Sequence, residues 1–239
     1  MKRCLLTALI ITCAFFQLVR AQKSNIEQLT NDVIQSLTEN NLIQARTGLK
    51  KLLTTAPQNP TVQTLAGIIA DRENNLVEAE KHFSLAAKLA PKSAETRNNY
   101  GAILVRMNRQ KHADKEFTAS LTINPDQPSA LVNLGQISFS EGNLTTAREM
   151  FNKAAKIQPD TEILRSLVLI SLQLNDKAQA TTEFPKFSAL LKNSPATTFE
   201  SEIALGKALS KNGLFAEAKE LFEIILAKNP DQIEVLVQL

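Results

Sequence analysis

Two asparagines are the side chains whose chemistry this sequence repeats at a fixed distance. Asn99 and Asn133 lie 34 residues apart, and each stands directly before a large residue and a glycine. A carboxamide offers both a donor and an acceptor, so a row of such groups can hydrogen-bond the backbone of an extended peptide. The row is short, because the equivalent residues are Leu65 before it and Leu167 after it. Two readings stay open: a peptide-binding pair, or ordinary polar residues of a helix.

Side chains typical of catalytic or metal sites are sparse. The two histidines, His82 and His112, stand near the starts of predicted helices, where we expect them to face solvent. Both cysteines, Cys4 and Cys13, fall within the first twenty residues, so the rest of the chain has neither a disulfide nor a thiolate metal site. Gly-rich phosphate loops, a nucleophile elbow and an HExxH stretch are missing. The sequence predicts no catalytic residue, no metal and no cofactor.

The asparagines belong to a repeat of 34 residues. Its fourth copy carries small, large and helix-ending residues in the series Leu134, Gly135, Ala147, Phe151, Ala154 and Pro159, and earlier copies carry counterparts at steps of 34. Self-similarity at such a period indicates a solenoid, whose units bury their apolar faces on one another. Each copy holds two amphipathic patterns, about Ser129–Ser140 and Thr145–Ile157 in the fourth, joined by a turn rich in Asn or Gly. The spacing thus encodes packing, with Gly135 small because two helices approach closely there.

This pattern resembles the tetratricopeptide repeat (TPR) family. The match covers Ile26 to Asp160 as four units and resumes from Phe199 to Gln232. The resemblance implies an all-α fold, a right-handed superhelical solenoid of antiparallel helix pairs, with a concave groove lined by the first helix of each pair. It also implies that a peptide or a partner protein binds in this groove.

The predicted organisation is a signal peptide at 1–21 followed by a solenoid at 22–239. Its repeats fall at about 26–59, 60–93, 94–127 and 128–161, followed by an irregular unit at 162–198, a further repeat at 199–232 and a partial helix at 233–239. The irregular unit has Leu169 where glycine is expected and carries Pro185 inside its second helical pattern. We expect Pro185 to kink or delay that helix and this unit to be the weak joint of the solenoid.

Candidate groove residues can be projected from the first helix of three repeats. They are Asn98, Asn99, Ala102, Arg106, Val132, Asn133, Gln136, Phe139, Lys207 and Lys211. Lys207 and Lys211 lie one turn apart, and cations in a TPR groove can clamp a terminal carboxylate. The clamp known from chaperone-binding TPR proteins is not expected, because positions that would need Lys or Arg hold Thr30, Ile34 and Glu95.

The N-terminus has the layout of a secretory signal peptide. Two basic residues precede sixteen uncharged, mostly apolar residues, and small side chains at Val19 and Ala21 precede a cleavage point. Sixteen residues fall short of the roughly 20 that span a bilayer. Three outcomes stay open: a cleaved signal with a periplasmic or secreted product, an uncleaved membrane tether, and a lipoprotein attached through Cys13. Without the basic residues of this segment, Lys plus Arg balances Asp plus Glu, so neither nucleic acid nor an anionic membrane is an expected partner.

We therefore expect an exported, non-enzymatic TPR adaptor that binds a peptide or partner protein in its groove. One alternative is an envelope-assembly factor of the kind that pilots type IV pilus secretins, to which the size, the N-terminus and the stretch from Asn98 to Gly101 look similar. A second alternative is the docking region of an enzyme whose catalytic part is absent here.

Overall fold

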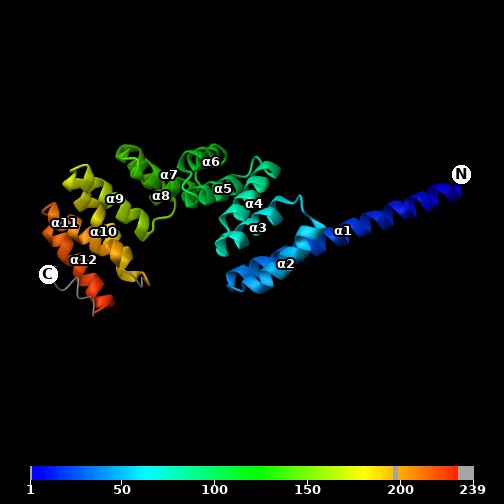
Figure 1. Ribbon diagram of the computed structural model, residues 1–239, viewed down its shortest axis with the longest axis horizontal. Helices are drawn as coiled ribbons and strands as arrows, with labels where there is room; N and C mark the ends of the chain where they lie inside the picture. The colour runs from blue at the N-terminus through cyan, green and yellow to red at the C-terminus, as the bar shows by residue number, and fades with distance from the viewer. Residues whose placement is uncertain (1, 196–198, 231–239) are drawn as a thin grey trace. The chain divides into compact units, whose positions relative to one another are not determined.

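The computed structural model describes residues 2–195 and 199–230, which form twelve α-helices and no β-strand (Figure 1). The helices are α1 Lys2–Thr38, α2 Leu42–Thr55, α3 Pro60–Arg72, α4 Leu76–Leu89, α5 Ala94–Arg106, α6 Gln110–Ile123, α7 Pro128–Ser140, α8 Leu144–Ile157, α9 Thr161–Gln173, α10 Lys177–Asn193, α11 Glu200–Lys211 and α12 Phe215–Lys228. Consecutive helices pack as antiparallel pairs, α3 on α4 and α7 on α8 for example. The predicted all-α fold of helix pairs is confirmed.

The chain divides into two compact units, residues 1–113 and 114–239, with the boundary inside α6. In the first unit, the pairs α1–α2 and α3–α4 stack with α5. In the second unit, the pairs α7–α8, α9–α10 and α11–α12 stack in order, with α9 against α11 and α10 against α12. The second helix of a pair also contacts the first helix of the next pair, α2 on α3, α4 on α5 and α8 on α9, so that neighbouring repeats stack.

A residue with positive φ ends the first helix of each pair. Asn40 and Asn74 adopt a φ of 57°, while Gly142 and Gly213 have φ values of 79° and 82°. Glycine and asparagine reach this left-handed region at low cost, which explains their recurrence in the turns. The turns predicted from the sequence are confirmed, and in the second turn Asn75 then caps α4 by accepting the N–H of Glu78 at 3.3 Å.

The seam inside a pair is a glycine of the first helix facing a phenylalanine of the second. A Cβ atom at Gly135 would lie 3.0 Å from Cε2 of Phe151, and one at Gly206 would lie 2.5 Å from Cε1 of Phe222. Both rings are 1% exposed. The small residue predicted at Gly135 is therefore needed, and the group that fills the space is the Phe151 ring rather than helix backbone.

The first pair reverses this arrangement. Val33 occupies the place of the glycine on α1, and the glycine appears instead on α2 as Gly48. A Cβ atom at Gly48 would lie 2.5 Å from Cγ2 of Val33, which is itself 1% exposed. The seam keeps one large and one small partner because close-packed helices leave no room for two large ones.

The irregular unit is shifted by one residue relative to the expectation. The residues preceding α7 and α9 are Gln127 and Asp160, 33 positions apart, because the connection after α8 is one residue shorter than its predecessors. The glycine position of α9 is therefore Val168, which is fully buried, and not Leu169, which is half-buried. The prediction at Leu169 was wrong.

The same shift changes the asparagine row. The structural counterpart of Asn133 on α9 is Ser166, which is half-buried, whereas Leu167 is 3% exposed and belongs to the core. The equivalence of Asn133 with Leu167 was therefore also wrong. A polar side chain continues the row at Ser166, although its hydroxyl donates to the Glu162 carbonyl of its own helix at 2.8 Å.

The extra residues of the irregular unit lengthen helix α10. It has 17 residues against 14 in α8, and it continues past Pro185 to Asn193. Its start, directly after the cap Asp176, is not delayed, so that part of the prediction was wrong. Pro185 lies on the exposed side, where water can reach the carbonyl that loses its helical donor. The neighbouring rings of Phe184 and Phe187 are buried, with centroids 6.1 Å apart.

The N-terminal helix α1 runs without interruption through the predicted signal segment into the first repeat. Cleavage after Ala21 remains a prediction. In the described part of the chain, no helix combines the length and apolar character that a membrane crossing requires. The partial helix predicted at 233–239 lies outside the described residues.

Candidate partner-binding surface

The first helices of each unit form a surface that we call the first-helix face. In the first unit it includes α5, which carries four candidate residues. Asn98 is 8% exposed, and its Oδ1 atom is buried without a hydrogen-bond partner. Asn99 and Ala102 are half-buried, and no internal hydrogen bond occupies the Asn99 amide.

Arg106, the fourth candidate, is engaged within the solenoid. Its guanidinium donates to the carboxylate of Asp71, to the Asp71 carbonyl at 3.4 Å and to Oδ1 of Asn74 at 3.2 Å. One repeat earlier, Arg72 donates in the same way to the Leu37 carbonyl at 2.7 Å. Each arginine thus ties its own helix to the end of the preceding first helix. Arg106 is therefore used for a contact between repeats, and its guanidinium is not free to bind a partner.

A hollow of about 130 Å³ lies between α3 and α5 on this face. Thr64 lines it from α3, and Ser93, Glu95 and Thr96 line it from the start of α5. The hydroxyl of Thr64 donates to the Pro60 carbonyl at 2.9 Å, so it is already used. Asn98 follows Glu95 by one helical turn, and its amide oxygen is the acceptor on this stretch that still lacks a donor.

The second unit has the equivalent hollow between α7 and α9, with a volume of about 380 Å³. Three candidates, Val132, Asn133 and Gln136, line it together with Glu162 and Ile163 of α9. The amide of Gln136 donates to the Glu162 carboxylate at 2.6 Å, which links the two helices across the hollow. Asn133 makes no hydrogen bond with another described side chain across this hollow, so its amide can serve a ligand.

The remaining candidates of the second unit are separate from this hollow. Phe139 is half-buried and packs against the hydrophobic core. Lys207 and Lys211 are exposed on α11. Close by, the buried carboxylate of Glu202 accepts from Nη1 of Arg165 at 2.8 Å and joins α11 to α9. The structure thus brings Val132, Asn133 and Gln136 together.

His82 does not face solvent as predicted. Its side chain is 16% exposed, with Nδ1 2.6 Å from Oε1 of Gln63 and Nε2 3.2 Å from the Glu78 carboxylate. Burial lowers the pKa of the imidazole, and the Glu78 carboxylate acts in the opposite direction. The 34-residue repeat could not predict this contact, because the contact joins side chains of two different helices, α3 and α4. His112 is exposed as expected, and no cluster of three metal-ligating side chains occurs in the described residues.

Sequence reasoning also missed a buried polar network in the irregular unit. The Ser171 hydroxyl donates to Oε2 of Glu183 at 2.6 Å, Gln179 donates to Oε1 at 2.9 Å, and Nη2 of Arg148 lies 3.4 Å from the Ser171 hydroxyl. Glu183 is 6% exposed. Its position one residue before Phe184, in the seam of the pair, is the signal that could have revealed it.

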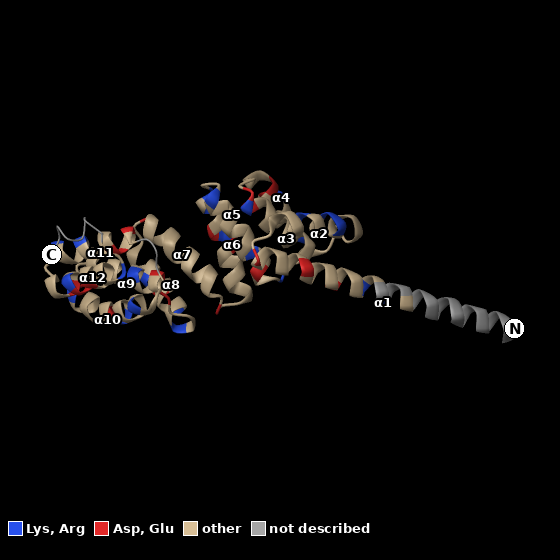
Figure 2. Cartoon of the chain, turned by 90° about the horizontal axis from the view of Figure 1, so that it is seen from below, with Lys and Arg blue, Asp and Glu red and all other residues tan. Residues whose placement is uncertain are grey.

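Charges of both signs are interspersed over the described helices (Figure 2). No basic stripe of the kind that follows a phosphate backbone is visible in that view. The groups that the first-helix face offers to a ligand are therefore amides and apolar side chains.

Comparisons with known proteins agree with the fold. A family model for the tetratricopeptide repeat matches residues 128–161. No curated protein matches the sequence significantly. Among solved structures, Pseudomonas aeruginosa PilF is similar with a TM-score of 0.76 at 17% identity, over 91% of this chain and 98% of that one.

Two further structures extend this likeness. PilW, described as a widely conserved type IV pilus biogenesis factor, matches with a TM-score of 0.75 at 21% identity, over 89% of this chain and 97% of that one. MamA from Desulfovibrio magneticus RS-1 matches with a TM-score of 0.61 at 20% identity, over 72% of this chain and 97% of that one. The chain thus carries a tetratricopeptide repeat at residues 128–161, and its fold is similar to that of these solved structures.

Proposed function

We propose that the protein is an exported, non-enzymatic adaptor that holds an extended peptide segment of a partner protein on its first-helix face. The fold supports a scaffold role, because TPR repeats generally mediate contacts between proteins. In the described residues the buried carboxylates Glu183 and Glu202 are both bonded internally, and no metal-ligating cluster is present. These features favour binding over catalysis.

The observation that carries this proposal is the unpaired amide oxygen of Asn98. A buried acceptor without a donor costs about 1–3 kcal/mol, and buried polar groups are nearly always paired in folded proteins. Rotation of the Asn98 side chain toward the surface would let a ligand backbone N–H supply the missing donor. Asn99 offers a further amide beside it on the same helix, which can also bond a peptide backbone. In the second unit, Asn133 offers an amide at the equivalent position of α7.

The test separates stability from binding by replacing Asn98. Asn98→Leu removes the unsatisfied amide at similar volume, so we expect the free energy of unfolding to rise, whereas ligand binding should weaken. Peptides selected from a displayed random library against the full chain serve as the probe. A matched control, Asn193→Leu, changes an exposed asparagine of α10.

Two results would count against the proposal. If Asn98→Leu lowered stability, the amide would already be satisfied in the free protein. If peptides whose binding is weakened by Asn99→Ala bound the Asn98→Leu variant as tightly as the parent, the Asn98 amide would not take part in recognition.

Export is the second part of the proposal, and it rests on the signal-like segment together with the likeness to PilW, a type IV pilus biogenesis factor. N-terminal sequencing of the protein recovered from cells should begin at Gln22. Recovery of a chain that retains Met1 in the cytosol would contradict export.

The near-complete coverage of PilF and PilW favours a role in type IV pilus assembly as the more specific form of this function. Deleting the gene in a piliated source strain should then abolish surface pili, with recovery on re-expression. Normal piliation in the deletion strain would contradict the role in pilus assembly, but it would not contradict the general adaptor role.

A further inference from the structure

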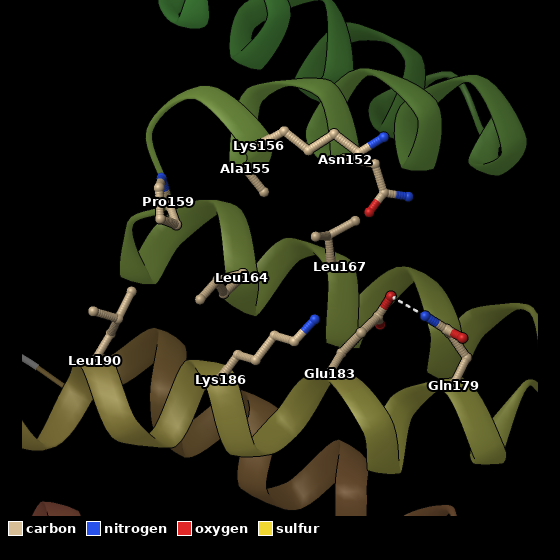
Figure 3. Close-up of a pocket in the computed structure, with 10 residues that line it drawn as sticks. All are labelled: Asn152, Ala155, Lys156, Pro159, Leu164, Leu167, Gln179, Glu183, Lys186 and Leu190. Carbon is tan, nitrogen blue, oxygen red and sulfur yellow. Dashed lines mark hydrogen bonds between the residues drawn. The ribbon is translucent and has the colours of Figure 1, made fainter.

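The second helices of the second unit carry a hollow that plays no part in the first-helix face. It lies between α8, α9 and α10 and has a volume of about 460 Å³ (Figure 3). Leu164 and Leu167 of α9 form its floor, and Ala155 and Leu190 extend the apolar lining. Leu190 is 37% exposed, which is unusual for a leucine next to a formed core.

Two lysines flank this apolar floor. Lys156 lies on the α8 edge and Lys186 on the α10 edge (Figure 3). Both are exposed, and neither forms a salt bridge with a described residue. The carboxylate in the hollow, Glu183, is occupied, because Ser171 and Gln179 donate to its two oxygens at 2.6 and 2.9 Å. The charges left for a ligand are therefore both positive.

A second hollow of the same design lies one repeat earlier. It has a volume of about 430 Å³ and is lined by Leu121, Leu131, Met150 and Ile157. Lys156 lies at its edge as well, together with one carboxylate, that of Asp126. Lys153, also at this edge, is paired with Glu149 at 2.7 Å. Lys156 is thus shared by two neighbouring apolar hollows.

Repetition of the hollow defines the pattern that a ligand must match. The two hollows lie on either side of α8 and share Lys156. Two apolar side chains of one extended segment can therefore enter the two hollows, with an acidic residue between them opposite Lys156. An acyl chain does not fit this pattern, because its anionic group is at one end.

We infer that these two hollows, with Lys156 and Lys186, form a docking track for a segment of a partner protein in which apolar residues alternate with Asp or Glu. Charge complementarity selects this partner, because an apolar floor alone would accept any apolar surface. Lys156 and Lys186 outnumber the one exposed carboxylate of the two hollows, Asp126, so they favour carboxylates beside the apolar anchors. This track is distinct from the first-helix face, so it gives the protein a second binding surface.

The test uses a displayed library of random peptides selected against the full chain. We expect enrichment of peptides in which two apolar residues are separated or flanked by carboxylates. Reversing both charges in Lys156→Glu/Lys186→Glu should weaken these peptides by about tenfold, since exposed ion pairs are individually weak. Filling the hollow by Ala155→Phe should weaken them without a change of charge. Higher salt should weaken them as well.

The control reverses the same number of charges elsewhere. Lys50→Glu/Lys88→Glu changes two exposed lysines of α2 and α4 and should leave affinity within about twofold if solvated charges outside the track contribute little. Circular dichroism checks that each variant is folded, and Asn98→Leu should not affect these peptides. The inference is overturned if the selected peptides lack acidic residues, if the track and control variants weaken them equally, or if no peptide is enriched.

Discussion

The sharpest test of the packing scheme is Gly206→Ala on α11. Alanine is worth about 1 kcal/mol more than glycine in an exposed helix interior, so the substitution would stabilise a helix without neighbours. Here the new Cβ would lie 2.5 Å from Cε1 and 2.6 Å from Cζ of Phe222. Ordinary carbon contacts are about 3.5–4.0 Å, so the ring must move.

Movement of the ring is expensive because Phe222 is 1% exposed and belongs to the core of the second unit. Overpacking a core costs about 1–3 kcal/mol. After the helix gain of about 1 kcal/mol, we expect Gly206→Ala to lower the free energy of unfolding by up to about 2 kcal/mol. At Gly135 the contact with Phe151 is 3.0 Å, so Gly135→Ala should be close to neutral.

Urea unfolding followed by circular dichroism measures both variants. A double mutant identifies the cause: with Phe222→Leu in place, the ring is gone and Gly206→Ala should no longer destabilise. Contacting residues typically show couplings of about 0.5–3 kcal/mol, and we expect about 1–2 kcal/mol here. The reasoning is refuted if Gly206→Ala stabilises the parent protein, or if its cost is unchanged in the Phe222→Leu background.

Two further predictions concern local features. Replacing His82 by leucine should cost about 1 kcal/mol at neutral pH, because Oε1 of the buried Gln63 loses its partner. Burial lowers the pKa of His82 in the folded state. The stability contributed by the neutral imidazole is therefore present above about pH 6.5 and is lost as the pH falls through the folded pKa. His82→Leu should flatten this part of the curve of unfolding free energy against pH, and an unchanged slope would contradict the prediction. Amide hydrogen exchange should be faster in 178–193 than in 145–156, as the sequence predicts for a helix that contains Pro185; equal protection would mean that the Glu183 network and the Phe184–Phe187 contact compensate for the missing donor.

Much of this fold is local, and the sequence by itself determined it. Asn40, Asn74 and Gly142 adopt positive φ at the turns, and only a few residue types reach that region cheaply. The 3.6-residue period of apolar residues predicts the helices, and the 34-residue repeat predicts how they pair, since each repeat contacts only its neighbours. The glycine at Gly135 could likewise be identified as a packing position from its recurrence.

The tertiary structure decided what depends on contacts between helices. The one-residue shift of α9 could not be predicted, because Val168 and Leu169 are both apolar and no glycine marks the register. The diversion of Arg106 to Asp71 and the burial of His82 against Gln63 arise from side chains of neighbouring helices, which a period does not specify. Asn98 looks like any polar helix residue in the sequence. Only the packing around it leaves its amide oxygen buried and unpaired, because burial depends on which atoms the neighbouring elements bring close.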